Sequence, residues 1–271
     1  MKIFKNRLLL QKEIAKINCI SFVPTMGGLH KGHLSLIKKA KNYKCKILVS
    51  IFINPKQFNK KQDFINYPSN LNNDIEILKK LKVDFLYTPS FKDIYSFKTK
   101  NKIHLNKFSN YLCGKFRKKH FKGVLNVVNR YLEIIKPKYI FLGLKDFQQL
   151  TLISYHIFKN KIKTKVIKCK TFREKNGVAC STRNFNLDKE QLLIASNVYK
   201  YLFKIKNKIK LNRKFFNQNK LKKDLFSLGI NKIEYIQNID LKRFFKITKS
   251  KKQTKIFIAY YIKDVRLIDN I

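Results

Sequence analysis

The sequence predicts an α/β protein in which a parallel β-sheet occupies the first part of the chain and a smaller α+β domain follows. Short apolar runs at 20–23, 47–53 and 139–142 alternate with helical patterns, as buried parallel strands do. After Asp188 the pattern changes to two helices followed by three short strands. With 271 residues, of which 44% are hydrophobic, the chain is long enough for one large domain or two small ones.

The individual elements follow from apolar periodicity and from the residues that begin or end helices. Strands are predicted at 20–23, 47–53, 84–87, 103–105, 139–142, 163–169, 233–237, 255–261 and 265–268. Helices are predicted at 1–18, 30–40, 70–81, 124–135, 188–204 and 216–228, with a further helix beginning near Asp146 as its N-cap. Residues 54–59 and 63–68 are expected to be loops, and the pair Asn176-Gly177 predicts a hairpin turn.

The net charge of +45 is extreme. A charge of this size predicts attraction to polyanions such as nucleic acid or a membrane surface. The lysines are, however, spread over almost every segment, and they accompany abundant asparagine, isoleucine and phenylalanine, which share A/T-rich codons. We therefore expect non-specific association with nucleic acid at low salt, but no specific nucleic-acid partner and no membrane partner. No apolar run approaches transmembrane length.

The five cysteines show no Cys-x-x-Cys spacing. Cys19, Cys45 and Cys169 lie in or beside strand-like runs, so we expect them to be core residues in a reducing compartment. The apolar run at 8–10 is too short for a signal peptide. These features together predict a cytoplasmic protein.

The clearest chemical signal is the pair His30 and His33, which share one face on the first turn of a helix. Gly27 and Gly28 let the chain turn sharply before that helix, and Gly32 leaves room for a flat ring. Because a helix N-terminus attracts anions, two imidazoles there suit a nucleoside triphosphate. The short pattern His-x-Gly-His alone fits equally well with two surface histidines beside a loop.

Other candidates stand after predicted strands, where open α/β sheets bind ligands. Asn54 and Gln57 follow the strand at 47–53 and either hold a small polar substrate or form a turn. Lys145 follows the strand at 139–142, where its charge would neutralise a phosphate.

A third candidate segment comes later in the chain. Ser181, Thr182 and Arg183 offer two hydroxyls and a planar cation, a set that fits triphosphate oxygens. The alternative is a basic linker.

Several separated blocks resemble one family. The pattern His-x-Gly-His after a strand is the signature of nucleotidylyl-transferring enzymes, and the longer blocks resemble the pantoate–β-alanine ligases. These blocks are Pro24-Thr25-Met26-Gly27 with His30 and His33, Val49 to Phe58, His120-Phe121 with Gly123-Val124, Gly143 to Gln149, Arg173 to Asn184, and Arg266 to Asn270.

The resemblance implies a Rossmann-like domain over 1–171 and a smaller lid domain over 172–271. It implies a cytoplasmic homodimer that joins pantoate to β-alanine using ATP and Mg²⁺ through a pantoyl-adenylate, releasing AMP and pyrophosphate. His33 takes the position of the family's proton donor, and with His30 and Lys145, singled out above, it makes up the predicted catalytic set. Gln57 and Gln149 take the pantoate-binding positions. The ATP-binding positions are Met26, Gly27, Gly28, Leu29, His30, Lys31, Gly32, His33, Gly143, Leu144, Lys145, Asp146, Phe172, Cys180, Ser181, Thr182 and Arg183. No residue is assigned as a metal ligand.

Two positions depart from the family pattern. The family has Arg-Pro-Gly-His-Phe where this chain has Lys118 and Lys119 between Arg117 and His120, so the conformation of that loop is open. Thr182 replaces a serine and keeps the hydroxyl. Two alternatives remain at this point: another His-x-Gly-His nucleotidylyltransferase, and a basic nucleic-acid-binding protein.

Overall fold

The chain forms two compact units. A computed structural model describes residues 1–59, 61–212, 215–241, 244 and 254–271. The first unit comprises residues 1–109 and 117–171, and the second comprises residues 110–116 and 172–271. The predicted α/β class with an additional smaller α+β domain is confirmed.

A six-stranded sheet forms the centre of the first unit. Its strands are β1 (Lys2–Phe4), β2 (Ile20–Thr25), β3 (Lys46–Ile51), β4 (Phe85–Tyr87), β5 (Tyr139–Gly143) and β6 (Lys165–Cys169). They lie in the order β1-β4-β3-β2-β5-β6, and every described pair is parallel. From β2 the chain first builds outward through β3 and β4, and it then returns to place β5 on the other side of β2. The carboxyl ends of β2 and β5 therefore form a topological switch point, where sheets of this kind bind ligands.

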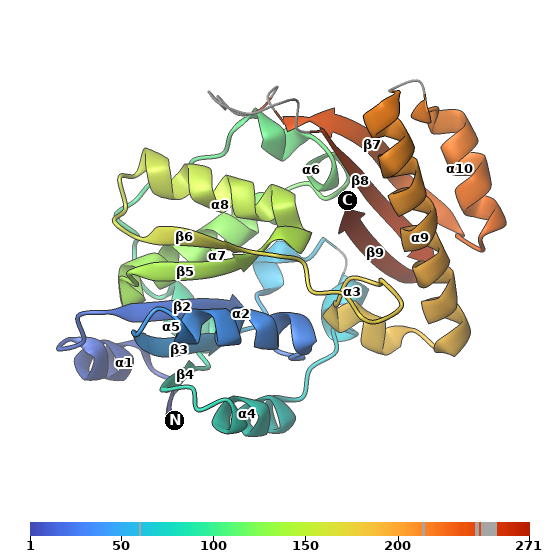
Figure 1. Cartoon of the computed structure of the whole chain (residues 1–271). Helices are drawn as coiled ribbons and strands as arrows, with labels where there is room; N and C mark the ends of the chain where they lie inside the picture. The colour runs from blue at the N-terminus through green and yellow to red at the C-terminus, as the bar shows by residue number, and fades with distance from the viewer. Residues whose placement is uncertain (60, 213–214, 242–243, 245–253) are drawn as a thin grey trace. The chain divides into compact units, whose positions relative to one another are not determined.

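Helices cover both faces of this sheet (Figure 1). One face packs against α1 (Arg7–Ile14), α7 (His120–Ile135) and α8 (Phe147–Lys159), and the other packs against α2 (Lys31–Lys41) and α4 (Leu71–Lys80). Successive strand residues serve opposite faces: Phe22 belongs to the core under α7, whereas Val23 belongs to the core under α2. The near-continuous apolar runs in the sequence follow from this two-sided burial.

Shorter turns of helix connect these elements. They are η1 (Pro55–Gln57), α3 (Lys61–Ile65), α5 (Phe91–Tyr95), η2 (Lys107–Asn110) and η3 (Leu144–Asp146) in chain order.

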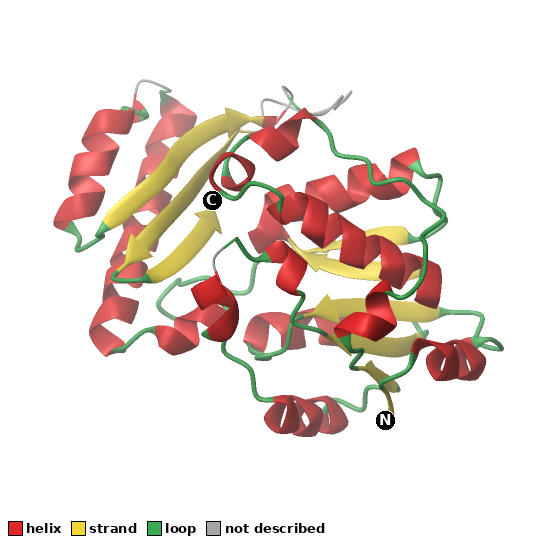
Figure 2. Ribbon diagram, turned by 180° about the vertical axis from the view of Figure 1, so that it is seen from behind, coloured by secondary structure: helices red, strands yellow, loops and turns green. Residues whose placement is uncertain are grey.

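The second unit packs two helices against an antiparallel sheet. Figure 2 shows its three strands with the helices behind them. The strands β7 (Lys232–Asp240), β8 (Thr254–Ile262) and β9 (Val265–Asn270) pair in that order, and the helices are α9 (Lys189–Leu211) and α10 (Gln218–Ser227). The short helices α6 (Cys113–Phe116) and η4 (Thr182–Asn186) complete the unit. Leu202, Leu225, Ile236 and Ile258 form part of its core.

Several predicted elements differ from the structure. The helix predicted at 1–18 is a short strand, β1, followed by α1. The strand predicted at 103–105 is wrong, since these residues form no regular element. The backbone N–H of His104 instead donates to Nδ1 of His156 (3.3 Å), so a side chain satisfies a group that a neighbouring strand would have bonded. The loop predicted at 63–68 begins within α3.

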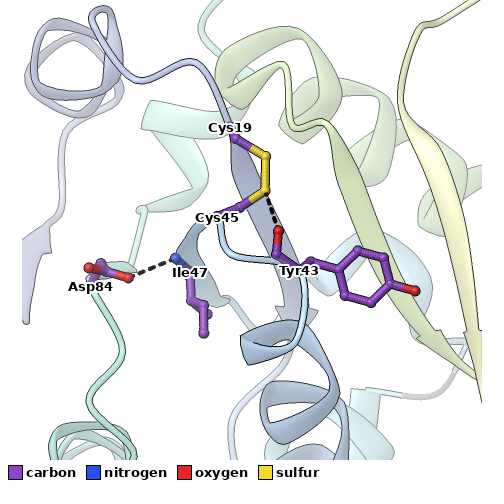
Figure 3. Close-up of a disulfide and its surroundings, with 5 residues drawn as sticks. All are labelled: Cys19, Tyr43, Cys45, Ile47 and Asp84. Atoms are coloured by element: carbon purple, nitrogen blue, oxygen red, sulfur yellow. Dashed lines mark hydrogen bonds between the residues drawn. A yellow bond between two sulfur atoms is a disulfide. The ribbon is translucent and has the colours of Figure 1, made fainter.

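The expectation that Cys19 and Cys45 are core residues is wrong: both are only partly buried, and they form a disulfide (Figure 3). They precede β2 and β3, and the pairing of Ile20 with Lys46 brings the two cysteines to a Cα–Cα distance of 4.9 Å. Cys169 is buried, as expected, and Cys113 and Cys180 are also buried cysteines that lie outside this disulfide. Within the described part of the chain, no helix is long and apolar enough to cross a membrane.

Candidate functional site

The loop between β2 and α2 is held by hydrogen bonds from both sides. Thr25 donates its hydroxyl to the carbonyl of Ser50 on β3 (2.7 Å) and accepts the N–H of Gly27 (3.2 Å). Gly27 and Gly28 adopt φ values of +81° and +60°, which glycine reaches without steric cost. The loop therefore leaves the sheet sharply and delivers the chain into the first turn of α2.

Asp74 fixes the same loop from α4. Its two carboxylate oxygens accept the N–H groups of Gly28 and Leu29, each at 2.8 Å. Asp74 is 1% exposed, and this burial raises the pKa of its carboxyl, although the two N–H bonds act in the opposite direction. No pattern in the sequence singles out this residue.

His30 and His33 lie together at the start of α2, with ring centroids 4.0 Å apart. His30 is the N-cap, and its Nδ1 accepts the N–H of Gly32 (3.1 Å). The Nδ1 of His33 in turn accepts the N–H of His30 (3.4 Å). Because both Nδ1 atoms act as acceptors, each neutral ring carries its proton on Nε2. The pair therefore presents two N–H donors at a helix N-terminus.

The electrostatic surroundings keep His33 uncharged. Removal from water lowers the pKa of His33 well below its usual range, and the neighbouring His30 ring and the ammonium of Lys145 lower it further. Lys145 thus acts on the histidine pair from η3, which directly follows β5. This places Lys145 at the switch-point edge of the sheet, as the sequence predicted.

Asp146 directly follows Lys145 at the predicted N-cap of α8, but its side chain makes no capping hydrogen bond. It lies instead 3.5 Å from the ammonium of Lys145. Gly143 and Leu144 belong to the same turn and are partly exposed. The turn therefore combines one cation, one carboxylate and accessible backbone.

Gln57 lies beside the loop that follows β2. Its side-chain amide donates to the sulfur of Met26, and Asn54 donates to its side-chain oxygen (3.3 Å). Asn54 itself is 1% exposed, and its own oxygen accepts the hydroxyl of Tyr95 (3.0 Å). Asn54 and Gln57 were both singled out after β3. Asn54 is buried and supports Gln57, whereas Gln57 itself contacts the predicted nucleotide loop.

Gln149 stands on the first turn of α8 and is partly exposed. Its neighbour Gln148 is buried and donates to the carbonyl of Phe108 (2.7 Å). The two adjacent glutamines therefore differ in surroundings: Gln148 supports the fold, and Gln149 is accessible next to the Lys145 turn.

The remaining predicted site residues belong to the second unit. Phe172 is exposed, and its carbonyl accepts the N–H of Cys180 (3.0 Å). Ser181 caps η4 by accepting the N–H of Arg183 (3.3 Å), while Thr182 is buried. The hairpin predicted at Asn176-Gly177 is present, since Arg173 bridges Ala179 across it. Ser181 and Arg183 are the accessible polar residues of the predicted segment.

The site is rich in hydrogen-bond donors and poor in metal ligands. Among the described residues, no group of three His, Cys, Asp or Glu side chains could hold a metal ion. Both oxygens of Asp74 accept backbone N–H groups, and Asp146 lies beside Lys145. Such a donor set suits phosphate oxygens, and any Mg²⁺ here would need most of its ligands from the phosphates and water.

The chain matches a family model described as Pantoate-beta-alanine ligase over residues 2–271. It is 41% identical over 262 residues to the pantothenate synthetase of Francisella tularensis subsp. novicida, covering 96% of this chain and 92% of that protein. It is 42% identical over 263 residues to the pantothenate synthetase of Francisella philomiragia, with 97% and 92% covered.

Solved structures give the same result. The pantoate-beta-alanine ligase of Francisella tularensis, complexed with beta-gamma ATP and beta-alanine, aligns with a TM-score of 0.85 at 40% identity, covering 100% of this chain and 97% of that one. The pantothenate synthetase of Thermus thermophilus aligns with a TM-score of 0.89 at 26% identity, with 100% and 99% covered.

Proposed function

The chain belongs to the pantoate–β-alanine ligase family, and on this basis we propose that its site at the switch point activates pantoate with ATP and transfers it to β-alanine. The enzyme is a ligase that forms a carbon–nitrogen bond, and the comparisons do not favour the nucleotidylyltransferase and nucleic-acid-binding alternatives. The observation that carries the site assignment is the paired Nε2–H donors of His30 and His33 beside the charge of Lys145.

In the first step the carboxylate of pantoate attacks the α-phosphorus of ATP, the bond to the pyrophosphate oxygen breaks, and pyrophosphate leaves. The carboxylate is already an anion at neutral pH, so this step needs no general base. The requirement is positioning of the reactants and neutralisation of developing negative charge. His30 and His33 donate from the helix N-terminus, and Lys145 adds a full positive charge.

The nucleotide also needs a surface for its other groups. We assign the backbone of Met26 to Leu29, together with Lys31 and Gly32, to the ATP site, because Gly27 and Gly28 carry no side chain that would keep a ligand away from the backbone. Gly143, Leu144 and Asp146 would contribute from the turn after β5. Phe172, Cys180, Ser181, Thr182 and Arg183 are proposed to contribute from the second unit.

Gln57 and Gln149 are proposed to bind the hydroxyl and carboxylate groups of pantoate. Their amides can both donate and accept hydrogen bonds, which suits a hydroxy acid. In the second step the amine of β-alanine attacks the activated acyl carbon, the bond to the AMP oxygen breaks, and the amine loses a proton. Water must be excluded from the mixed anhydride until this attack, and the second unit is proposed to act as the lid.

Three further properties follow from family membership and complete the proposal. Mg²⁺ would be carried mainly by the phosphates of ATP and would neutralise part of their charge. The enzyme would be a homodimer in the cytoplasm. The Cys19–Cys45 disulfide is unusual for that compartment, so its state in the cell bears directly on the localisation.

The phosphate-binding assignment is tested with His33→Ala and Lys145→Ala. Each change should slow adenylate formation by roughly two to three orders of magnitude, the usual effect of removing one transition-state contact. Pyrophosphate exchange into ATP in the presence of pantoate measures this step alone. Lys170→Ala, on a lysine outside the proposed site, serves as the control for the loss of one charge. Unchanged exchange in both site variants would contradict the assignment.

The pantoate assignment is tested with Gln57→Ala and Gln149→Ala. Each should raise the pantoate concentration needed for half-maximal rate by roughly tenfold, because one or two hydrogen bonds to the substrate are lost. The corresponding value for ATP should stay close to that of the unaltered enzyme. Pantoate saturation curves that superimpose on the wild-type curve would remove the glutamines from the site.

A further inference from the structure

Gln57 lies on a loop that is held tightly against the beginning of α7. The carbonyl oxygen of Lys56 approaches Gly123 so closely that a Cβ at position 123 would lie 2.1 Å from it. The side chain of Asn54 also donates to the carbonyl of Gly123 (3.3 Å). The loop after β3 and the first turn of α7 therefore form one packed assembly.

Two side chains, one from the turn before α7 and one from the first residue of α7, converge on the backbone carbonyl of Gln57. The Nδ1 of His120 lies 2.6 Å from this oxygen, and an Nη2 of Arg117 donates to the same oxygen at 3.2 Å. His120 is 9% exposed, so its bond to the carbonyl is shielded from water. A carbonyl oxygen only accepts, and Nδ1 of His120 must therefore carry the proton.

The same geometry determines the protonation of the other ring nitrogen, Nε2. In neutral His120 the Nε2 then has a lone pair, and an Nη1 of Arg117 lies 3.3 Å from it. The guanidinium thus donates both to the histidine and to the carbonyl that the histidine holds. Arg117 is itself near a carboxylate of Asp63, at 3.9 Å. With this protonation of His120, each of these hydrogen bonds joins one donor to one acceptor.

We propose that Arg117 and His120 are positioning residues for pantoate, which act by fixing the backbone of Gln57 so that its amide faces the nucleotide loop. The inference rests on the proposed role of Gln57 in binding pantoate. Neither residue needs to touch the substrate. Because Asn54 holds the side-chain oxygen of Gln57 and this pair holds its carbonyl, both ends of the residue are fixed.

The proposal also explains why two residues of the family pattern, Arg117 and His120, are retained in the altered loop. Lys118 and Lys119 replace two residues of the family pattern, yet Arg117 and His120 remain on either side of them. The carbonyl of Lys118 accepts the side-chain N–H of Asn59 (2.7 Å), which joins the loop to the segment after Gln57. The substituted positions thus provide backbone contacts, and the retained positions provide the two side-chain donors.

The test compares His120→Asn with His120→Leu. The amide N–H of asparagine stands close to where Nδ1–H stood, so His120→Asn should keep the bond to the Gln57 carbonyl, whereas leucine removes it. We expect His120→Leu to raise the half-saturating pantoate concentration roughly tenfold, as loss of a buried hydrogen bond implies. His120→Asn should stay within about threefold of the wild type, and the value for ATP should change in neither variant.

Arg117→Lys supplies a second variant that does not depend on a buried ring. Lysine keeps the charge but cannot donate to two acceptors in the same fixed geometry. Arg117→Lys should also raise the half-saturating concentration of pantoate while leaving that of ATP unchanged. Thermal unfolding of each variant separates a folding defect from an effect on binding.

A double-mutant cycle separates this inference from the proposed function. If Gln57→Ala does not weaken pantoate saturation, the assignment of Gln57 fails. If Gln57→Ala weakens it but His120→Leu and Arg117→Lys do not, the positioning role fails. If the role is correct, His120→Leu adds little in a Gln57→Ala background, because the residue acts through Gln57. Equal losses for pantoate and ATP, with no rescue by His120→Asn, would reduce His120 to a structural residue.

Discussion

Asp74 shows how one buried carboxylate can organise a binding loop. It lies on the first turn of α4, 45 and 46 residues along the chain from the two N–H groups it accepts. Its burial raises the pKa of the carboxyl, which means that the charged form is disfavoured in the folded protein. The fold keeps this group because two adjacent N–H groups of a glycine-containing turn need an acceptor.

Asp74→Asn should therefore disturb the nucleotide loop. An asparagine can accept only one of the two N–H bonds, and its NH₂ group would face the other N–H. We expect a loss of about 1–3 kcal/mol in the free energy of unfolding, the usual cost of leaving a buried polar group unsatisfied. ATP saturation should weaken as well. Chemical denaturation and ATP titration measure the two effects.

Glu76→Gln is the matched control for Asp74→Asn, since it removes a carboxylate from the same helix. Glu76 is exposed and pairs with Lys79 at 2.9 Å. Such surface pairs contribute little to stability. If the two variants behaved alike, the loop contact of Asp74 would have no special role.

At the scale of residues, the sequence predicted the site residues that lie close together in the chain and missed the contacts between residues that lie far apart. His30 and His33 are recognisable because the glycine turn, the start of the helix and both rings lie within the seven residues 27–33. Asp74, Arg117 and His120 act on that loop and on Gln57 across 45 to 63 residues. Nothing in the periodicity of a single sequence reveals such contacts. The family block at His120 was the only signal that pointed to one of them.

The turn before α7 is an element with an unfavourable residue in a required conformation. Lys119 adopts φ +67° and ψ −11°, a left-handed conformation that costs a residue with a Cβ roughly 1–2 kcal/mol. It occupies the position where the family pattern has glycine. The conformation that the sequence left open is therefore a turn that forms with lysine, and it does so under strain.

Lys119→Gly should stabilise the protein. Glycine removes the steric cost, although it also gives the unfolded chain more freedom, so we expect a net gain of about 0.5–1 kcal/mol. The midpoint of thermal or urea unfolding measures the change. Lys122→Gly, three residues later within α7, should instead lower stability by about 1 kcal/mol, because helix interiors disfavour glycine. A destabilising Lys119→Gly would show that the lysine side chain makes a contact that outweighs the strain.

At the scale of elements, the parallel strands and long helices were the predictable part. Buried strands give apolar runs, and α7 gives helical spacing that ends before Pro137. The wrong predictions concern short segments whose conformation depends on residues far away in the sequence. β1 has only three residues and exists through its pairing with β4. The segment 103–105 has a strand-like composition, but the N–H of His104 donates to the side chain of His156 and not to a neighbouring strand.

At the scale of the whole molecule, the disulfide links two loops that are far apart in the sequence. It closes a loop with a sequence separation of 26 residues at the end of the sheet opposite to the carboxyl ends of β2 and β3. A cross-link of this span stabilises a protein mainly by restricting the unfolded chain. The cysteine spacing gave no sign of the pair, because it depends on the parallel register of β2 and β3.

Cys19→Ser and Cys45→Ser should each lower the free energy of unfolding by roughly 3 kcal/mol under oxidising conditions, as expected for a closed loop of this length. With a reductant present, the wild type should fall to about the stability of the variants. Thiol counting on the unfolded wild-type protein should give three free thiols without reductant and five with it. Five thiols without reductant would show that the bridge is not formed in solution.

The second unit is not continuous in the chain, because it includes residues 110–116. In that segment the sulfur of Cys113 lies 3.0 Å from the hydroxyl of Tyr235, and Arg266 donates to the same sulfur at 3.5 Å. The ring of Phe116 also packs near that of Tyr235. A gene fragment that starts at Phe172 would consequently encode a second unit with a gap beside Tyr235, and we expect the addition of a peptide spanning 110–116 to fill it.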